Sequence, residues 1–202
     1  MAPVRAVLWD ADGVLQQGVP SWPAVFGELV GDQVDAFGAA VWGRLEDALA
    51  GRFDMAQHVN EVIRDLHLTD RRDAILDVWG MIDPLVQSRE VVRSVRGDGT
   101  SCYLATNQDT LRASHMRSLM EYDDLLDGSY YSCELGVAKP AAEFFLAVAE
   151  DLGIQQSELL FLDDQPENVA GARAAGLRSE QWHHADGIDA LTAHLAAHGV
   201  QA

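Results

Sequence analysis

Basic side chains are scarce in this chain of 202 residues, which has 14 of them against 32 acidic ones and a formal net charge of −18. Lys139 is the one lysine, and every other basic residue is an arginine. Proteins bind nucleic acid and anionic membrane surfaces through clusters of Lys and Arg. We therefore expect neither nucleic acid nor a membrane as a partner.

Cysteine and long apolar runs are scarce as well. Two cysteines, Cys102 and Cys133, are too few for a disulfide scaffold and fit a reducing compartment. The sequence contains no apolar run near the roughly 18 residues that a membrane span needs, and its first residues do not resemble a secretory signal. These features predict a cytoplasmic protein, either a monomer or a small homo-oligomer.

Hydrophobic residues are abundant, at 48% of the chain, which is enough to build a folded core. Residues 4–9, 101–105 and 159–162 are apolar runs without polar alternation, a pattern typical of strands covered on both faces. Residues 129–132 and 178–183 are weaker strand candidates. Helical patterns separate these runs, so we predict an α/β fold: a Rossmann-like parallel sheet core with helices on both faces.

Residues 15–84 interrupt this alternation. Apolar residues recur at helical spacing over 55–66 and again over 75–82, with no convincing strand between the two stretches. The simplest interpretation is an all-helical unit inserted into the α/β core. The predicted division is therefore a core of residues 1–14 and 85–202 and a helical unit of residues 15–84.

Polar residues stand where the predicted strands end, and in open parallel sheets ligands bind beyond the carboxyl ends of the strands. These residues are Asp10 and Asp12, Thr106 and Asn107, and Asp163 and Asp164. Asp10 and Asp12 are two residues apart, so in an extended chain their side chains leave the same face. Carboxylates gathered at one edge repel each other, and a hard divalent cation such as Mg²⁺ would offset the repulsion.

A phosphoryl group would account for the other polar residues. Thr106 offers a hydroxyl, Asn107 an amide and Lys139 a compact positive charge, all suited to phosphate oxygens. Pro140 would open a helix whose N-terminus faces the anion. Each signal alone is common in turns and caps, and the hypothesis depends on all of them standing at strand ends.

Four segments of the chain together resemble the motifs of the haloacid-dehalogenase-like (HAD) hydrolase superfamily. Residues 8–15, Leu-Trp-Asp-Ala-Asp-Gly-Val-Leu, resemble its first motif, and residues 105–107 and 136–140 resemble its second and third. Residues 161–164 with Asn168 resemble the fourth, and residues 162–176 are especially similar to the capped subfamily I. The resemblance covers nearly the whole predicted core, whereas residues 15–84 match the family's cap only in position and helical character.

The resemblance implies a Mg-dependent phosphatase that hydrolyses a small phosphate monoester, with a sugar phosphate as the leading example. It implies that Asp10 is the nucleophile, forming an aspartyl phosphate, and that Asp12 is the general acid and base. The phosphoryl oxygens would be held by Thr106, Asn107 and Lys139. The metal would be held by Asp10, by the backbone carbonyl of Asp12 and by Asp164, with Asp163 and Asn168 in support.

Within the superfamily, the presence of Asp12 favours a phosphatase over a dehalogenase. The dehalogenases lack this second aspartate, because a halide leaving group needs no proton. A phosphomutase of the same family would keep the same core residues and stays open as an alternative. A catalytically silent binding protein is a weaker one, since such a protein would be expected to lose Asp10, Asp12 or Lys139. A two-component receiver domain also uses Asp, Thr and Lys, but in a different order along the chain, which argues against that class of protein.

Overall fold

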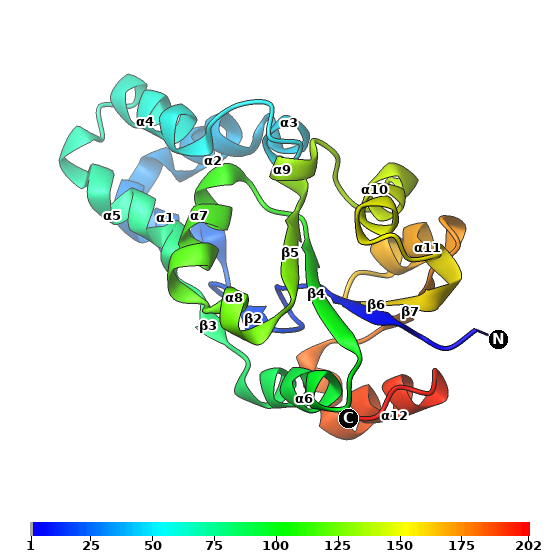
Figure 1. The fold of residues 1–202 in the computed structure, drawn as a ribbon. Helices are drawn as coiled ribbons and strands as arrows, with labels where there is room; N and C mark the ends of the chain where they lie inside the picture. The colour runs from blue at the N-terminus through cyan, green and yellow to red at the C-terminus, as the bar shows by residue number, and fades with distance from the viewer. Residues whose placement is uncertain (1) are drawn as a thin grey trace.

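The computed structural model describes residues 2–202. At its centre lies a five-stranded parallel sheet with the strand order β5-β4-β1-β6-β7 (Figure 1). The strands are β1 (Ala6–Trp9), β4 (Ser101–Thr106), β5 (Gly128–Tyr131), β6 (Leu159–Asp163) and β7 (Arg178–Gln181). The predicted fold class is confirmed, and both of the weaker strand candidates form edge strands of the sheet.

Strand β1 explains why the central strands have no polar alternation. Val7 and Trp9 belong to one hydrophobic cluster, which includes residues of α6 (Val86–Gly97) and α12 (Ile188–Ala197). Ala6 and Leu8 point the other way, into a cluster with α10 (Ala142–Leu152) and α11 (Pro166–Ala174). Helices cover both faces of the sheet (Figure 1), so successive side chains are all buried.

The connections around the sheet position the polar residues at its carboxyl edge. After β4, Asp109 caps helix α7 (Thr110–Leu119), because its Oδ1 accepts from the backbone N–H groups of residues 111 and 112 at 2.9 Å. Short helices α8 (Tyr122–Leu125) and α9 (Ser132–Leu135) flank β5. Helix α10 begins at Ala142, so the expectation that Pro140 opens this helix is wrong. Ala141 stands before the helix with a non-helical backbone, φ −57° and ψ 133°.

Between β1 and β4 the chain forms a set of helices that we call the helical region, Trp22–Gly80. It contains α1 (Trp22–Val30), α2 (Val34–Trp42), α3 (Leu45–Leu49), α4 (Met55–Asp65) and α5 (Arg72–Asp77), with short 3-10 turns at Gly31–Gln33, Thr69–Arg71 and Val78–Gly80. Buried residues such as Phe26, Phe37 and Trp79 give it a hydrophobic cluster of its own. These helices lie together beside the sheet in Figure 1.

Two short strands that the sequence pattern does not predict join the ends of this segment. Strand β2 (Gln16–Gln17) pairs antiparallel with β3 (Asp83–Pro84). The backbone N–H of Leu85 also donates to the carbonyl of Leu15 at 3.0 Å. The chain therefore leaves and re-enters the neighbourhood of the sheet at one place. Within residues 2–202, no helix combines the length and apolar character needed to cross a membrane.

Candidate active site

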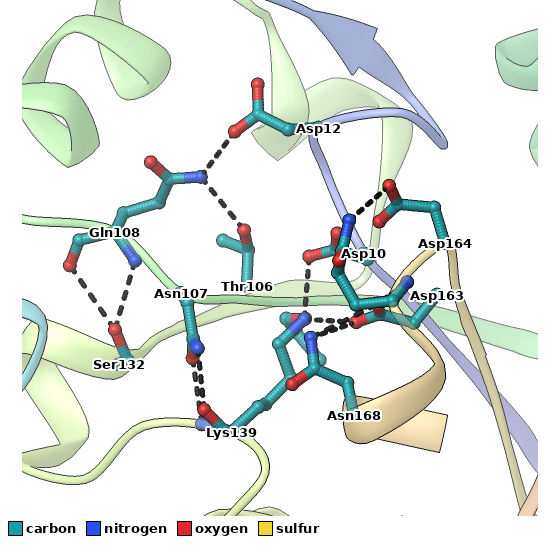
Figure 2. A network of polar contacts seen from close by, with 12 residues as sticks. Asp10, Asp12, Thr106, Asn107, Gln108, Ser132, Lys139, Asp163, Asp164 and Asn168 are labelled. Atoms are coloured by element: carbon teal, nitrogen blue, oxygen red, sulfur yellow. Dashed lines mark hydrogen bonds and ion pairs between the residues drawn. The ribbon is translucent and has the colours of Figure 1, made fainter. Parts of the chain in front are cut away.

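The carboxyl ends of three adjacent strands bring the predicted residues together (Figure 2). Asp10 follows β1 directly, Thr106 is the last residue of β4, and Asp163 is the last residue of β6. Because β1 pairs with β4 on one side and with β6 on the other, these ends are neighbours at one edge of the sheet. The parallel sheet thus brings residues about 150 positions apart in the chain into one cluster. The cluster lies beyond the carboxyl ends of the strands, where open α/β sheets bind their ligands.

Lys139 lies at the centre of this cluster and is 4% exposed. Its Nζ donates to Asp10 Oδ1 at 2.7 Å, to Asp163 Oδ2 at 2.6 Å and to the carbonyl oxygen of Ala105 at 2.9 Å. Burial by itself would lower the pKa of Lys139, but the carboxylates of Asp10 and Asp163 outweigh burial and raise it. The ammonium group is therefore held charged in the interior.

Asn107 fixes the backbone on which Lys139 stands. Its Oδ1 accepts from the backbone N–H of Lys139 at 2.8 Å, and its Nδ2 donates to the carbonyl oxygen of Lys139, also at 2.8 Å. Figure 2 shows this pair of hydrogen bonds beside the lysine side chain. Both polar ends of the Asn107 side chain are engaged with Lys139, so the amide orients the lysine.

The carboxylate of Asp163 is fully buried and surrounded by donors. Its Oδ1 accepts from the backbone N–H of Gln165 at 2.8 Å, and Asn168 Nδ2 lies 3.1 Å and 3.0 Å from its two oxygens. The Lys139 Nζ also donates to Asp163 Oδ2. Asp163 is therefore oriented on every side and in turn orients Lys139.

Three carboxylates form an acidic cluster, in which oxygens of Asp10, Asp163 and Asp164 all lie within 4.8 Å of one another. Burial raises the pKa of Asp10 to about 7; Lys139 opposes this shift and Asp163 adds to it. Burial, followed by the charge of Asp163, also raises the pKa of Asp164. Carboxylate oxygens in such a group are the donors that hard divalent cations prefer, so the residues fit a metal of the Mg²⁺ class.

Gly13 keeps the space beside Asp164 open. Its φ is +82°, and a Cβ at this position would lie 3.0 Å from both Asp164 Oδ2 and His183 Cδ2. Any other residue would strain the backbone and push against the carboxylate. Asp164 itself is half-buried and accepts from Gln165 Nε2 at 2.7 Å, so its carboxylate has fewer protein donors than that of Asp163.

Asp12 is held by side chains that sequence reasoning missed. Arg112 Nη2 donates to its Oδ1 at 2.8 Å, Gln108 Nε2 to its Oδ2 at 2.8 Å, and Gln16 Nε2 to its Oδ1 at 3.1 Å. Gln108 Nε2 also lies 3.0 Å from Thr106 Oγ1, as Figure 2 shows. In the sequence, Gln108 directly follows the Thr106-Asn107 pair and Arg112 comes four residues later, but neither position by itself indicates a contact with Asp12.

One cavity of about 390 Å³ gathers most of the predicted site. Seven of the eight predicted site residues line it, namely Asp10, Asp12, Thr106, Asn107, Lys139, Asp164 and Asn168. The eighth, Asp163, is fully buried behind them. His183 and His184 also line this cavity. We call it the phosphoryl cavity, after the ligand that the sequence predicts.

Comparison with known proteins identifies the family. The model of the haloacid dehalogenase-like hydrolase family matches residues 4–176. The chain belongs to this family and is a hydrolase, which confirms the resemblance seen in the motifs.

Named relatives agree with this assignment. The chain is 30% identical over 141 residues to phosphatase MT3486 of Mycobacterium tuberculosis, covering 67% of this chain and 64% of that protein. It is 31% identical over 98 residues to sesquiterpene phosphatase astK of Aspergillus oryzae, covering 48% of this chain and 50% of that protein. The chain thus spans between half and two thirds of the length of these relatives.

The HAD family enzyme bt-2542 from Bacteroides thetaiotaomicron, in its complex with magnesium and inorganic phosphate, has the same fold. Its TM-score is 0.79 at 19% sequence identity, with 93% of this chain and 98% of that chain covered.

Proposed function

We propose that this protein is a Mg-dependent phosphatase that hydrolyses a small phosphate monoester through a phosphorylated Asp10. The observation that carries the proposal is the geometry around Asp10. This carboxylate lies at the phosphoryl cavity, 2.7 Å from a buried ammonium group and within 4.8 Å of two further carboxylates. Two relatives named as phosphatases support the reaction class.

In the first step, an Asp10 oxygen forms a bond to phosphorus while the bond from phosphorus to the ester oxygen breaks. Asp12 gives its proton to the departing oxygen, which leaves as an alcohol. In the second step, a water oxygen attacks the phosphorus of the aspartyl phosphate and passes a proton to Asp12. The bond between phosphorus and Asp10 breaks, inorganic phosphate leaves, and both aspartates return to their starting states.

Of the three residues expected to hold the phosphoryl oxygens, Lys139 and Thr106 act on them directly in this scheme. Asn107, whose side-chain amide is bonded to the backbone of Lys139, acts through the lysine. The Lys139 ammonium is held in place by Asp163 and by the backbone clamp of Asn107, and its positive charge offsets the negative charge that develops on the phosphoryl oxygens. Thr106 presents its hydroxyl at the end of β4, where Gln108 orients it. A fixed positive charge and donors in a water-poor site are the main catalytic devices in phosphoryl transfer.

The metal would be held by Asp10, by the backbone carbonyl of Asp12 and by Asp164. Asp164 suits this role better than Asp163, because the Asp163 oxygens are already occupied by Lys139, Asn168 and a backbone N–H. When bound, a magnesium ion would neutralise charge on the phosphoryl oxygens and on the acidic cluster. The magnesium and phosphate complex of bt-2542, which shares the fold, supports this choice of cation.

We further propose the domain division expected from the sequence, with residues 1–14 and 85–202 as the core and residues 15–84 as a cap. The separate hydrophobic cluster of the helical region supports it, as does the β2–β3 pairing that joins the two ends of the segment. A cap placed there would cover the phosphoryl cavity and supply contacts to the substrate.

The experiment is release of inorganic phosphate from an aryl phosphate and from a panel of phosphate esters that includes sugar phosphates, with magnesium and with EDTA. We expect magnesium-dependent release. Interconversion of sugar phosphate isomers without net release would identify a phosphomutase instead, and binding without turnover would identify a silent relative.

A further inference from the structure

A second cavity adjoins the phosphoryl cavity on the side of the helical region. Its volume is about 600 Å³, and it shares Asp12, Gly18 and Gln108 with the phosphoryl cavity. An ester whose phosphorus lies at Asp10 must place its bridging oxygen near Asp12, if Asp12 is to protonate it. The group attached to that oxygen would then extend into the second cavity, which we call the leaving-group cavity.

Apolar side chains of the helical region form the wall of the leaving-group cavity. Trp22, Trp42 and Trp79 pack against each other there, with ring centroids 5.6–6.2 Å apart. The remaining apolar lining comes from Val19, Pro23, Leu45 and Leu49. Leu45 is 41% exposed, so a large aliphatic side chain stands at an accessible part of this wall. Exposed apolar surface beside a polar reaction centre is a common mark of a ligand site.

The charged groups that line this cavity are paired with other protein groups. Arg112 donates to Asp12 at 2.8 Å and to the carbonyl oxygen of Trp79 at 3.1 Å. Asp109 accepts from Trp79 Nε1 at 3.1 Å and from the first backbone N–H groups of α7. A sugar in this cavity would place several hydroxyls against tryptophan and leucine, or would compete with these existing bonds. Polar groups buried without a partner cost binding free energy.

We propose that the leaving group is an apolar alcohol bound in the leaving-group cavity, a narrower substrate class than the sugar phosphates that the motifs suggest. The proposal rests on the proposed phosphatase function. At about 30 Å³ for each water-sized volume, the cavity holds on the order of 20 non-hydrogen atoms. It therefore has room for an apolar group larger than one hexose ring.

The test compares two esters with the same ring size and the same linkage to phosphate, cyclohexylmethyl phosphate and glucose 6-phosphate, with ethyl phosphate as a reference that leaves the cavity almost empty. Both larger esters carry a six-membered ring on a primary CH₂–O–phosphate. We expect kcat/KM for cyclohexylmethyl phosphate to exceed that for glucose 6-phosphate by about 100-fold, because the hydroxyls of the sugar would be left unpaired. The kcat/KM for cyclohexylmethyl phosphate should also exceed the kcat/KM for ethyl phosphate.

A matched pair of variants tests whether the preference for the apolar ester depends on the wall of the leaving-group cavity. Leu45→Gln changes the cavity wall, and Leu146→Gln changes a leucine of similar exposure, 42%, on α10 outside the cavity. We expect Leu45→Gln to lower the ratio of kcat/KM between cyclohexylmethyl and ethyl phosphate by about tenfold. Leu146→Gln should keep the wild-type ratio, and thermal unfolding should show both variants folded.

The outcomes separate this proposal from the proposed function. If magnesium-dependent phosphate release occurs and glucose 6-phosphate is hydrolysed as well as its apolar counterpart, the apolar leaving group is refuted and the phosphatase stands. An unchanged ratio in Leu45→Gln would likewise overturn the assignment of the cavity. If none of the esters, nor an aryl phosphate, releases phosphate, it is the phosphatase function that fails.

Discussion

Replacing Asp10 by asparagine should abolish turnover and, in the absence of metal, stabilise the protein. The side chain keeps nearly the same volume, but it can no longer attack phosphorus or carry a negative charge. In the native protein, the Asp10 carboxyl is buried beside Asp163 and within 4.8 Å of Asp164. Lys139 can still pair with Asp163 in the variant, at the 2.6 Å seen in the structure.

The magnitude follows from the pKa of Asp10, which burial raises from 3.8 to about 7. Between these two values the folded protein keeps a proton on Asp10 that the unfolded chain has lost. Stability therefore falls as the pH rises from about 4 through 7. One pKa unit corresponds to about 1.4 kcal/mol, so this group contributes a loss of about 4 kcal/mol over that range.

The assay is thermal or urea unfolding of metal-free protein in EDTA at pH 5 and pH 8. At pH 8 we expect the Asp10→Asn variant to have the higher free energy of unfolding, by up to about 4 kcal/mol, or about 10 °C in Tm. At pH 5 the difference should be about a third of this, because pH 5 lies about one unit above the pKa at which the loss begins. Magnesium should stabilise the native protein at pH 8 more than the variant, because the variant lacks one proposed ligand.

Asp65→Asn is the control, since the Asp65 side chain is 78% exposed on the helical region. It should leave the pH dependence of unfolding unchanged. A variant at Asp10 that is no more stable than the native protein at pH 8 in EDTA would refute the reasoning, as would full phosphatase activity in that variant.

Three further predictions concern other parts of the site. Lys139→Arg should lose most of kcat, because the planar guanidinium fork does not fit where one Nζ meets three oxygens at 2.6–2.9 Å; near-native turnover would argue against a point charge there. Asp164→Asn should raise the magnesium concentration for half-maximal activity about tenfold, whereas an unchanged magnesium titration would remove Asp164 from the ligand set. Arg112→Met should lower kcat and destabilise the fold by about 1–3 kcal/mol, since it removes donors to Asp12 and to the Trp79 carbonyl; native kcat and urea midpoint would contradict this.

The sheet and its polar carboxyl edge were predictable because they depend on local patterns. A strand covered on both faces is apolar along its length, and β1 and the first four residues of β6 are both buried and apolar. The first polar residue after such a strand must then stand at its end, as Asp10 does, while Thr106 and Asp163 are the terminal residues of their own strands. Lys139 stands out in the sequence because it is the one lysine, and the structure buries it.

The network around Asp12 was not predictable in this way. Its donors Gln108 and Arg112 are 96 and 100 residues away in the chain, and neither glutamine nor arginine is unusual after a strand or in a helix. Their role appears only when α7 is placed beside the loop after β1. The two-residue strands β2 and β3 are too short to produce any alternating pattern. The start of α10 depends on the backbone at Ala141, which propensity does not determine.

The most direct test of the central claim is to look for phosphate on Asp10 during turnover. The native protein is mixed with an aryl phosphate and magnesium, quenched with acid within the first turnovers, and its peptides are mapped by mass spectrometry. We predict a phosphoryl group on the peptide that contains Asp10, which appears and decays at rates consistent with turnover. Phosphate release with no covalent phosphate on Asp10, or with phosphate on another residue, would contradict the proposed mechanism.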